Sequence, residues 1–166
     1  AAIGSGVRQV SYNNASDLMT AEWTPTVNSG GVGYEVAVGA NGVVHVVVGT
    51  QYYRSDSNGA NFELKSGNGI GQFPAAGNRK RIAVAPTNND YIYAVNVDGN
   101  ECLRWVIRST DGGDTWEEIG AGGSDIFAPM SNSVQCQGSY DLAFAIDPAN
   151  ENRIFLGGIS FWSWSL

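Results

Sequence analysis

The chain has 166 residues, of which 43% are hydrophobic, so it is long enough to form a globular unit with a sizeable core. Its net charge of −7 argues against nucleic acid or an anionic membrane as a partner, and no run of about 18 apolar residues could cross a bilayer. Twenty-two glycines, 11% aromatic residues and only nine Lys plus Arg are typical of short strands joined by many turns, as in surface or secreted β proteins.

The first predicted element is a single strand within residues 15–33, around Glu22-Trp23-Thr24-Pro25. Three copies of one pattern follow, in which a polar pair runs into an apolar strand, a turn and a second β-rich strand. Internal repeats of roughly 40 to 60 residues built from short strands indicate a propeller or an array. The first strands cover 34–38, 80–84 and 140–144, the turns 40–42, 86–90 and 147–152, and the second strands 43–48, 91–95 and 153–156.

The segment Ser109–Trp116 carries the most specific motif, because it satisfies every fixed place of S-x-D-x-G-x-x-W. Such a segment suits a tight turn between two antiparallel strands. Asp111 can accept hydrogen bonds from N–H groups of its own loop, and Gly113 can take a positive φ. Trp116 can pack back between sheets.

The motif recurs in weaker form earlier in the chain, from Ser55 to Phe62. The serine, Gly59 and the aromatic residue are kept, while Ser57 stands in place of the central aspartate. A third copy is expected to start at Ser163, which follows Ser109 at the same spacing as Ser109 follows Ser55. We expect Phe62, Trp116 and Trp23 to wedge between neighbouring sheets.

Ser109–Trp116, with residues 85–93 upstream, resembles the Asp-box (BNR) repeats of β-propellers. Such repeats occur in sortilin-like propellers, xyloglucan-hydrolysing propeller enzymes and many large secreted bacterial proteins. The resemblance covers about residues 34–166 and implies an all-β fold, namely a partial β-propeller of four-stranded antiparallel blades with Asp-box turns. It does not imply an activity, because fold does not fix function.

Under this interpretation, residues 1–166 form a single incomplete propeller segment. Propellers close with about four to eight blades. The missing blades are therefore expected from the rest of a longer chain or from a partner protein. The parts are an outer strand of a preceding blade (15–33), a blade (34–80), a blade with insertions (81–140) and a truncated blade (141–166).

The candidate ligand site is the mouth of the propeller channel, where the first strand of each blade begins. Carboxylates, cations and tyrosines around one rim would suit a polar ligand such as a glycan. The alternative is that these are ordinary strand ends that form ion pairs with Arg81. The rim residues are Tyr34, Glu35, Lys80, Arg81, Tyr140 and Asp141.

An enzymatic version of this hypothesis makes Glu35 and Asp141 the acid and base of a glycosidase. The family resemblance weakens it. The arginine triad and the tyrosine–glutamate pair of sialidases have no identifiable match. Gln51 stands where the xyloglucan-hydrolysing enzymes have an aspartate, and an amide cannot be a general base. We therefore name no catalytic residue, although catalysis could reside in blades that are absent.

Cys102 and Cys136 both lie outside the minimal repeat, so we expect a disulfide between two insertions; two buried free thiols are the alternative. His45, the only histidine, is interpreted as a strand residue. Asp111, Asp114 and Glu117 could suggest Ca²⁺, but a turn closed by its own hydrogen bonds is the better interpretation. No metal and no cofactor are expected.

The favoured function is that of a non-catalytic propeller segment of a large secreted or cell-surface protein, such as an exported bacterial protein. It would bind glycan or protein at the upper channel face. Two alternatives stay open. One is part of a secreted glycoside hydrolase, and the other is an exported cargo or structural component of a larger assembly.

Overall fold

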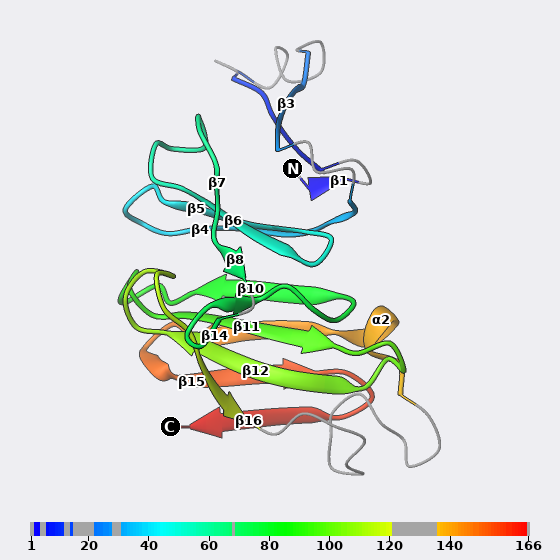
Figure 1. Ribbon diagram of the computed structural model, residues 1–166. Coiled ribbons are helices and arrows are strands. Elements are labelled where there is room, and N and C mark those ends of the chain that lie inside the picture. Colours follow the sequence, from blue (N-terminus) through cyan, green and yellow to red (C-terminus); the bar gives the residue numbers. More distant parts are fainter. Residues whose placement is uncertain are drawn as a thin grey trace.

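The structure, a computed structural model, describes residues 2–3, 6–11, 14, 22–27, 31–67, 69–120 and 136–165. Its regular elements are short antiparallel strands, with one four-residue helix among the described residues. Four sheets of three or four strands stack in chain order from the N-terminus to the C-terminus (Figure 1). The fold class predicted from the sequence, all-β with four-stranded antiparallel sheets, is confirmed.

The N-terminal sheet has the strand order β1 (Ala2–Ile3), β2 (Gly6–Gln9) and β3 (Thr24–Val27). Only β3 was expected, as an outer strand, and it does lie at the edge of its sheet. Its partner strands β1 and β2 were missed. Trp23 was expected to wedge between sheets but is 38% exposed, which corrects that expectation. Residues 15–21 and 28–30 of the expected outer segment lie outside the described residues.

The second and third sheets each contain four antiparallel strands in chain order, and each is a simple up-and-down meander. A small parallel pair, β8 (Ser66–Gly67) and β9 (Phe73–Pro74), lies in the connection between the two sheets. The second sheet consists of β4 (Gly33–Val38), β5 (Val44–Val48), β6 (Gln51–Ser55) and β7 (Glu63–Leu64). The third consists of β10 (Lys80–Val84), β11 (Ile92–Val97), β12 (Leu103–Ser109) and β13 (Glu117–Gly120).

The C-terminal sheet contains β14 (Ala143–Asp147), β15 (Asn150–Gly157) and β16 (Phe161–Ser165). Its first strand was expected at residues 140–144. Instead, Gly138–Asp141 form the short helix α2, and the strand begins at Ala143. Tyr140 and Asp141 are therefore helical residues and do not begin a strand.

The register of the strands also corrects the expected third turn motif. In the second sheet Val38 pairs with Val44, and Val44 with Ser55; in the third sheet Ile92 pairs with both Val84 and Ser109 in the same way. In the C-terminal sheet the residues paired across the three strands at the corresponding position are Ile146, Ile154 and Trp164, so a tryptophan stands where the other sheets have the serine. Ser163 lies opposite Phe155 and is exposed, so it does not occupy the position of the motif serine.

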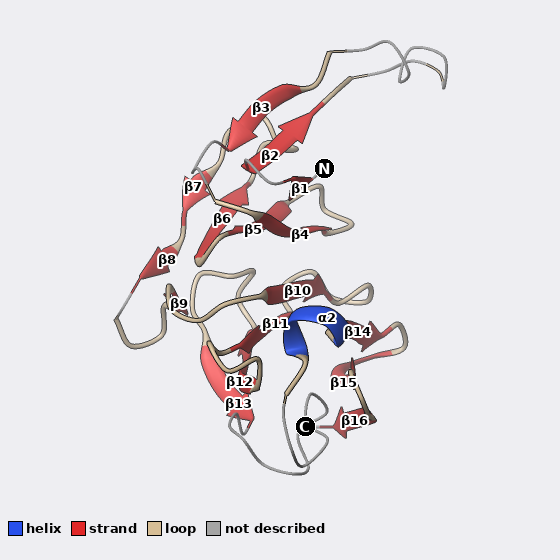
Figure 2. Ribbon diagram, turned by 90° about the vertical axis from the view of Figure 1, so that its right-hand side faces the viewer, coloured by secondary structure: helices blue, strands red, loops and turns tan. Residues whose placement is uncertain are grey.

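The first strands of the sheets lie side by side: β1 packs on β4, β4 on β10, and β10 on β14 (Figure 2). Three apolar layers separate the successive sheets. The first is built around Val7, Val27 and Val46, the second around Tyr52, Phe73 and Trp116, and the third around Tyr93, Val106 and Ile154. Each sheet is thus stabilised mainly by the faces of its neighbours.

A disulfide joins Cys102 to Cys136, as the sequence predicted. Cys102 lies in the hairpin between β11 and β12, and Cys136 precedes α2. The bond therefore ties the third sheet to the segment that leads into the C-terminal sheet. The backbone supports the same link, because the Gly138 N–H donates to the carbonyl oxygen of Glu101.

Candidate functional site

The turn Ser109–Trp116 closes through its own side chains. The Ser109 hydroxyl accepts the N–H of Gly113 at 2.8 Å and donates to Asp111 at 2.7 Å. Asp111 in turn accepts the N–H and the hydroxyl of Thr115 at 2.8 and 2.6 Å. These hydrogen bonds lower the pKa of Asp111 although partial burial alone would raise it. The predicted role of Asp111 as the acceptor that holds the loop is therefore visible in the geometry.

Gly113 and Trp116 complete this turn. Gly113 has φ 93°, a conformation that an L side chain rarely adopts. Trp116 is buried, donates its indole N–H to the Gly113 carbonyl, and stacks edge-on against Tyr52 and Phe73. The turn thereby stabilises the packing of the third sheet against the second.

The weaker copy, Ser55–Phe62, keeps the same hydrogen-bond plan. The Ser55 hydroxyl accepts the N–H of Gly59 at 3.0 Å, and the Ser57 hydroxyl accepts the N–H of Asn61 at 3.1 Å. Ser57, which also lies 3.3 Å from the Ser55 hydroxyl, thus reproduces two of the three hydrogen bonds that Asp111 makes in the other turn. Gly59 again has a positive φ, of 84°, while Phe62 is only half-buried.

Arg54, directly before Ser55, joins the two turns. Its guanidinium donates to the Gly112 carbonyl at 3.1 Å and to Asp114 at 2.7 Å, and also pairs with Asp56. The turn residue Asp114 is therefore occupied by a cation of the neighbouring sheet. Among the described residues, no group of three or more His, Cys, Asp or Glu side chains is placed to hold a metal ion.

The turns lie at the end of the sheets where the first strands finish, so the predicted rim is at the opposite end. There Arg81 of β10 pairs with Glu35 of β4 at 2.8 Å, and the two side chains are 30% and 24% exposed. Burial raises the pKa of Glu35, while Arg81 and Arg79 oppose that rise. The sequence hypothesis of an ion pair between Glu35 and Arg81 matches this contact.

Lys80 does not belong to an accessible rim. Its side chain is fully buried and faces the layer between the second and third sheets, with Nζ 6.0 Å from the centre of the Trp105 ring. Successive strand residues point to opposite faces, so Lys80 and Arg81 cannot share one. Burial, and secondarily the charge of Arg104, lower the pKa of Lys80 to about 8. Its Nζ has no hydrogen-bond partner among the described residues.

The third pair of predicted rim residues lies on α2. Tyr140 is 78% exposed and Asp141 is exposed. The sequence missed Arg79, which directly precedes β10 and whose guanidinium donates to the Ser139 carbonyl of α2. The strand period gives the signal that could have found it, because residues 79 and 81 fall on the same side. The side chain of Tyr34 lies outside the described part of the structure.

His45 is buried in β5, where its Nδ1 lies 2.9 Å from the Tyr52 hydroxyl. Burial and the charge of Arg54 lower the pKa of His45 to about 4. The imidazole is therefore neutral at neutral pH, in agreement with its interpretation as a strand residue.

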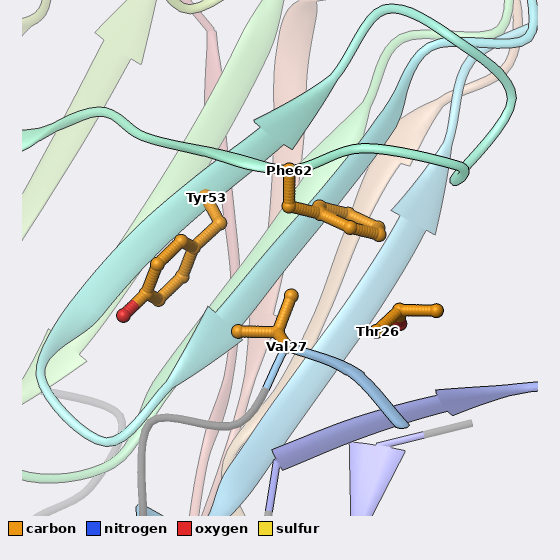
Figure 3. A pocket seen from close by; sticks show the side chains of 4 residues that line it. All are labelled: Thr26, Val27, Tyr53 and Phe62. Carbon is orange, nitrogen blue, oxygen red and sulfur yellow. The ribbon is translucent and has the colours of Figure 1, made fainter. Parts of the chain in front are cut away.

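A cavity of about 190 Å³ lies between the N-terminal sheet and the second sheet. Tyr53 and Phe62 line it from one side, and Thr26 and Val27 from the other (Figure 3). The sequence did not predict this cavity. No helix within the described ranges is long and apolar enough to span a membrane.

The sequence matches no protein-family model and no curated protein. The fold, however, is similar to solved structures. A GH74 xyloglucanase from Xanthomonas campestris superposes with a TM-score of 0.59 at 20% identity, over 86% of this chain and 22% of that one. An ancestral GH74 enzyme gives 0.58 at 19% identity, over 86% and 18%. The GH74 enzyme of Niastella koreensis gives 0.54 at 17% identity, over 90% and 24%.

The chain thus spans only about a fifth of the length of the solved structures that it matches. At this level of identity the similarity shows the fold and no activity. Combined with the stacked antiparallel sheets and their adjacent first strands, it identifies the architecture as a partial β-propeller.

Proposed function

We propose that this chain is a non-catalytic segment of a secreted or cell-surface β-propeller, with turns of the Asp-box type, that binds a glycan or a protein at the rim where β4 and β10 begin. The ion pair between Glu35 and Arg81 also fits the alternative of ordinary strand ends. The observation that carries the proposal is that both side chains stay part-exposed at the rim, where a polar ligand can reach them. Arg79 and the exposed Tyr140 of α2 extend the same end of the molecule. Charged and aromatic groups that converge beside a channel are suited to a polar ligand.

The surroundings of Glu35 support binding without chemistry. Burial, Arg81, the Val36 backbone and Arg79 set its pKa, and none of these is a second carboxylate. Acid–base hydrolysis of a glycoside needs two carboxylates that flank the scissile bond. Asp141, the expected partner, is exposed on α2. The disulfide favours an extracellular location, because such bonds persist in oxidising compartments.

Binding at the rim can be tested by calorimetric titration of the chain with xyloglucan and cello-oligosaccharides. Arg81→Ala should weaken binding about tenfold or more, because it removes a charged partner and leaves Glu35 unpaired. Arg153→Ala is the matched control, since Arg153 pairs with Asp147 at 3.4 Å on the C-terminal sheet, away from the rim. Equal affinities of wild type and Arg81→Ala would contradict the rim as the glycan site. A screen for extracellular protein partners would then follow with the same two variants.

A second candidate function is a segment of a glycoside hydrolase, which the structural similarity to GH74 enzymes favours. The same oligosaccharides, incubated with the protein and assayed for new reducing ends, separate the two candidates. We expect no release of reducing ends by this chain. Release that Glu35→Gln abolishes would replace the binding proposal with the hydrolase.

A further inference from the structure

The cavity lies in the layer between the N-terminal sheet and the second sheet. The corresponding place in the layer between the second and third sheets is filled by an aromatic side chain. In that next layer the motif aromatic residue is Trp116, which packs tightly against Tyr52 and Phe73. In the first layer the corresponding residue is Phe62, which is smaller and half-buried. The replacement of an indole by a phenyl ring leaves room beside Phe62. The resulting cavity of about 190 Å³ reaches the side chains of Thr26, Val27 and Tyr53.

The two hydroxyl groups that line this cavity both donate a hydrogen bond to another part of the protein. Tyr53 donates its hydroxyl proton to the Gln51 side-chain oxygen at 2.7 Å, and Thr26 donates its own to the Val7 carbonyl at 3.2 Å. Each hydroxyl oxygen keeps lone pairs that can accept a further bond. A ligand that satisfies both must therefore bring O–H or N–H donors. A purely apolar side chain would leave the accepting lone pairs of both oxygens unused.

The charge of the lining side chains further limits which class of ligand the cavity can bind. Within the described part of the chain, two hydroxyl-bearing and two apolar side chains line the cavity, and none of these four is acidic or basic. A charged ligand would lose hydration here without gaining an opposite charge. The aromatic faces of Phe62 and Tyr53 and the methyl groups of Val27 suit a ligand with apolar C–H faces. The volume is also large enough for a single ring, since an enclosed cavity of about 150 Å³ accommodates benzene, although this site is open to solvent.

We propose that this cavity is a binding site for one ring of a neutral saccharide. The ring would place its C–H face against Phe62 and Tyr53 and donate hydroxyl protons to Thr26 and Tyr53. The site is separate from the Glu35–Arg81 rim, since it lies between β3 and the outer strands of the second sheet (Figure 3). The proposal for this cavity can therefore be tested independently of the rim proposal.

The chain itself offers the variant that tests this site. Phe62→Trp introduces the residue that the other turn carries at position 116, so it should fill the cavity and keep the fold. The probes are methyl β-glucopyranoside and cellotetraose, followed by NMR shifts of the Thr26 and Val27 amides and methyl groups. We expect saturable shifts in the wild type and a loss of affinity of about tenfold or more in Phe62→Trp, with an unchanged or higher melting temperature.

Tyr53→Phe keeps the test valid if Phe62→Trp misfolds. It removes one acceptor and leaves the ring, so affinity should fall about threefold to tenfold. Arg153→Ala, on the C-terminal sheet, should leave the Thr26 and Val27 shifts unchanged. The site is refuted if Phe62→Trp binds cellotetraose as tightly as the wild type. It is equally refuted if the shifts appear only with an apolar probe such as toluene. If Arg81→Ala alone abolishes sugar binding, the rim proposal survives and this one fails.

Discussion

Single buried side chains have large effects on the stability of this propeller segment. Lys80 is the clearest case, because an ammonium group in an apolar layer with no described hydrogen-bond partner opposes folding. Its pKa is lowered from 10.5 to about 8, and this sets the sign of the pH effect. Below about pH 8, Lys80 is charged in both folded and unfolded states, and the full penalty is present. Between about pH 8 and 10.5 the folded state loses its proton first, so stability rises with pH.

Lys80→Met should therefore raise the free energy of unfolding at pH 7, by up to about 3 kcal/mol for a shift of this size. The gain should shrink as the pH rises from about 8 towards 10.5. Urea unfolding at pH 7 and pH 10 measures both effects. Lys65→Met, a part-exposed lysine that pairs with Glu63, is the control and should change little. A destabilised Lys80→Met at pH 7 would mean that the ammonium has a stabilising partner.

Trp116 gives a second prediction at the same scale. Its indole is buried between the second and third sheets, so Trp116→Ala should cost about 3 to 5 kcal/mol. Trp162→Ala, at a residue that is 40% exposed, should cost much less. Thermal and urea unfolding of both variants provide the measurement. Wild-type stability in Trp116→Ala would contradict the role assigned to the turn.

At this scale the sequence was most informative where a motif combines several residue types. Asp111, Gly113 and Trp116 each have the contact or conformation that the motif predicts. Lys80 was placed on the rim because it stands at the start of the first strand of its blade, whereas strand alternation turns this side chain into the core. Alternation was therefore the better guide.

At the scale of single elements, the disulfide joins the hairpin between β11 and β12 to the segment that precedes α2. It joins two cysteines 34 residues apart, and α2 begins two residues after Cys136. A loop of this length corresponds to a stabilisation of about 3 to 4 kcal/mol in the chain-entropy view.

Cys102→Ser with Cys136→Ser should therefore lower the free energy of unfolding by about 3 to 4 kcal/mol. Reduction of the wild type should have a similar effect and should leave the double variant unchanged. Urea unfolding with and without reductant measures this difference. An identical stability of the reduced and oxidised wild type would show that the bond does not constrain the chain.

The errors of element prediction have common physical causes. The four residues of α2 carry too little helix signal to be read from sequence, and β1 and β2 are a short hairpin without strong alternation. The third turn was sought at the spacing that separates the first two, but hairpins of unequal length break a constant spacing. Strand register instead puts Trp164 in the line that holds the serine in the other sheets. Such tertiary pairing is not encoded in local sequence.

At the scale of the whole molecule, the described chain has two four-stranded and two three-stranded sheets. A ring needs about four to eight complete blades, and open sheet edges invite pairing with another strand. The exposed Phe161 and Trp162 of β16 lie at such an edge. We therefore propose that further blades, from a longer chain or a partner protein, complete the propeller.

The most direct test of this account is the mass of the native protein in solution, measured by light scattering together with intact-mass spectrometry. These 166 residues alone have a mass of 17.6 kDa. We expect a larger particle, either because the polypeptide is longer or because it is assembled with itself or a partner. A stable, monodisperse monomer with the mass of these residues alone that unfolds cooperatively would contradict the claim that this segment needs further blades.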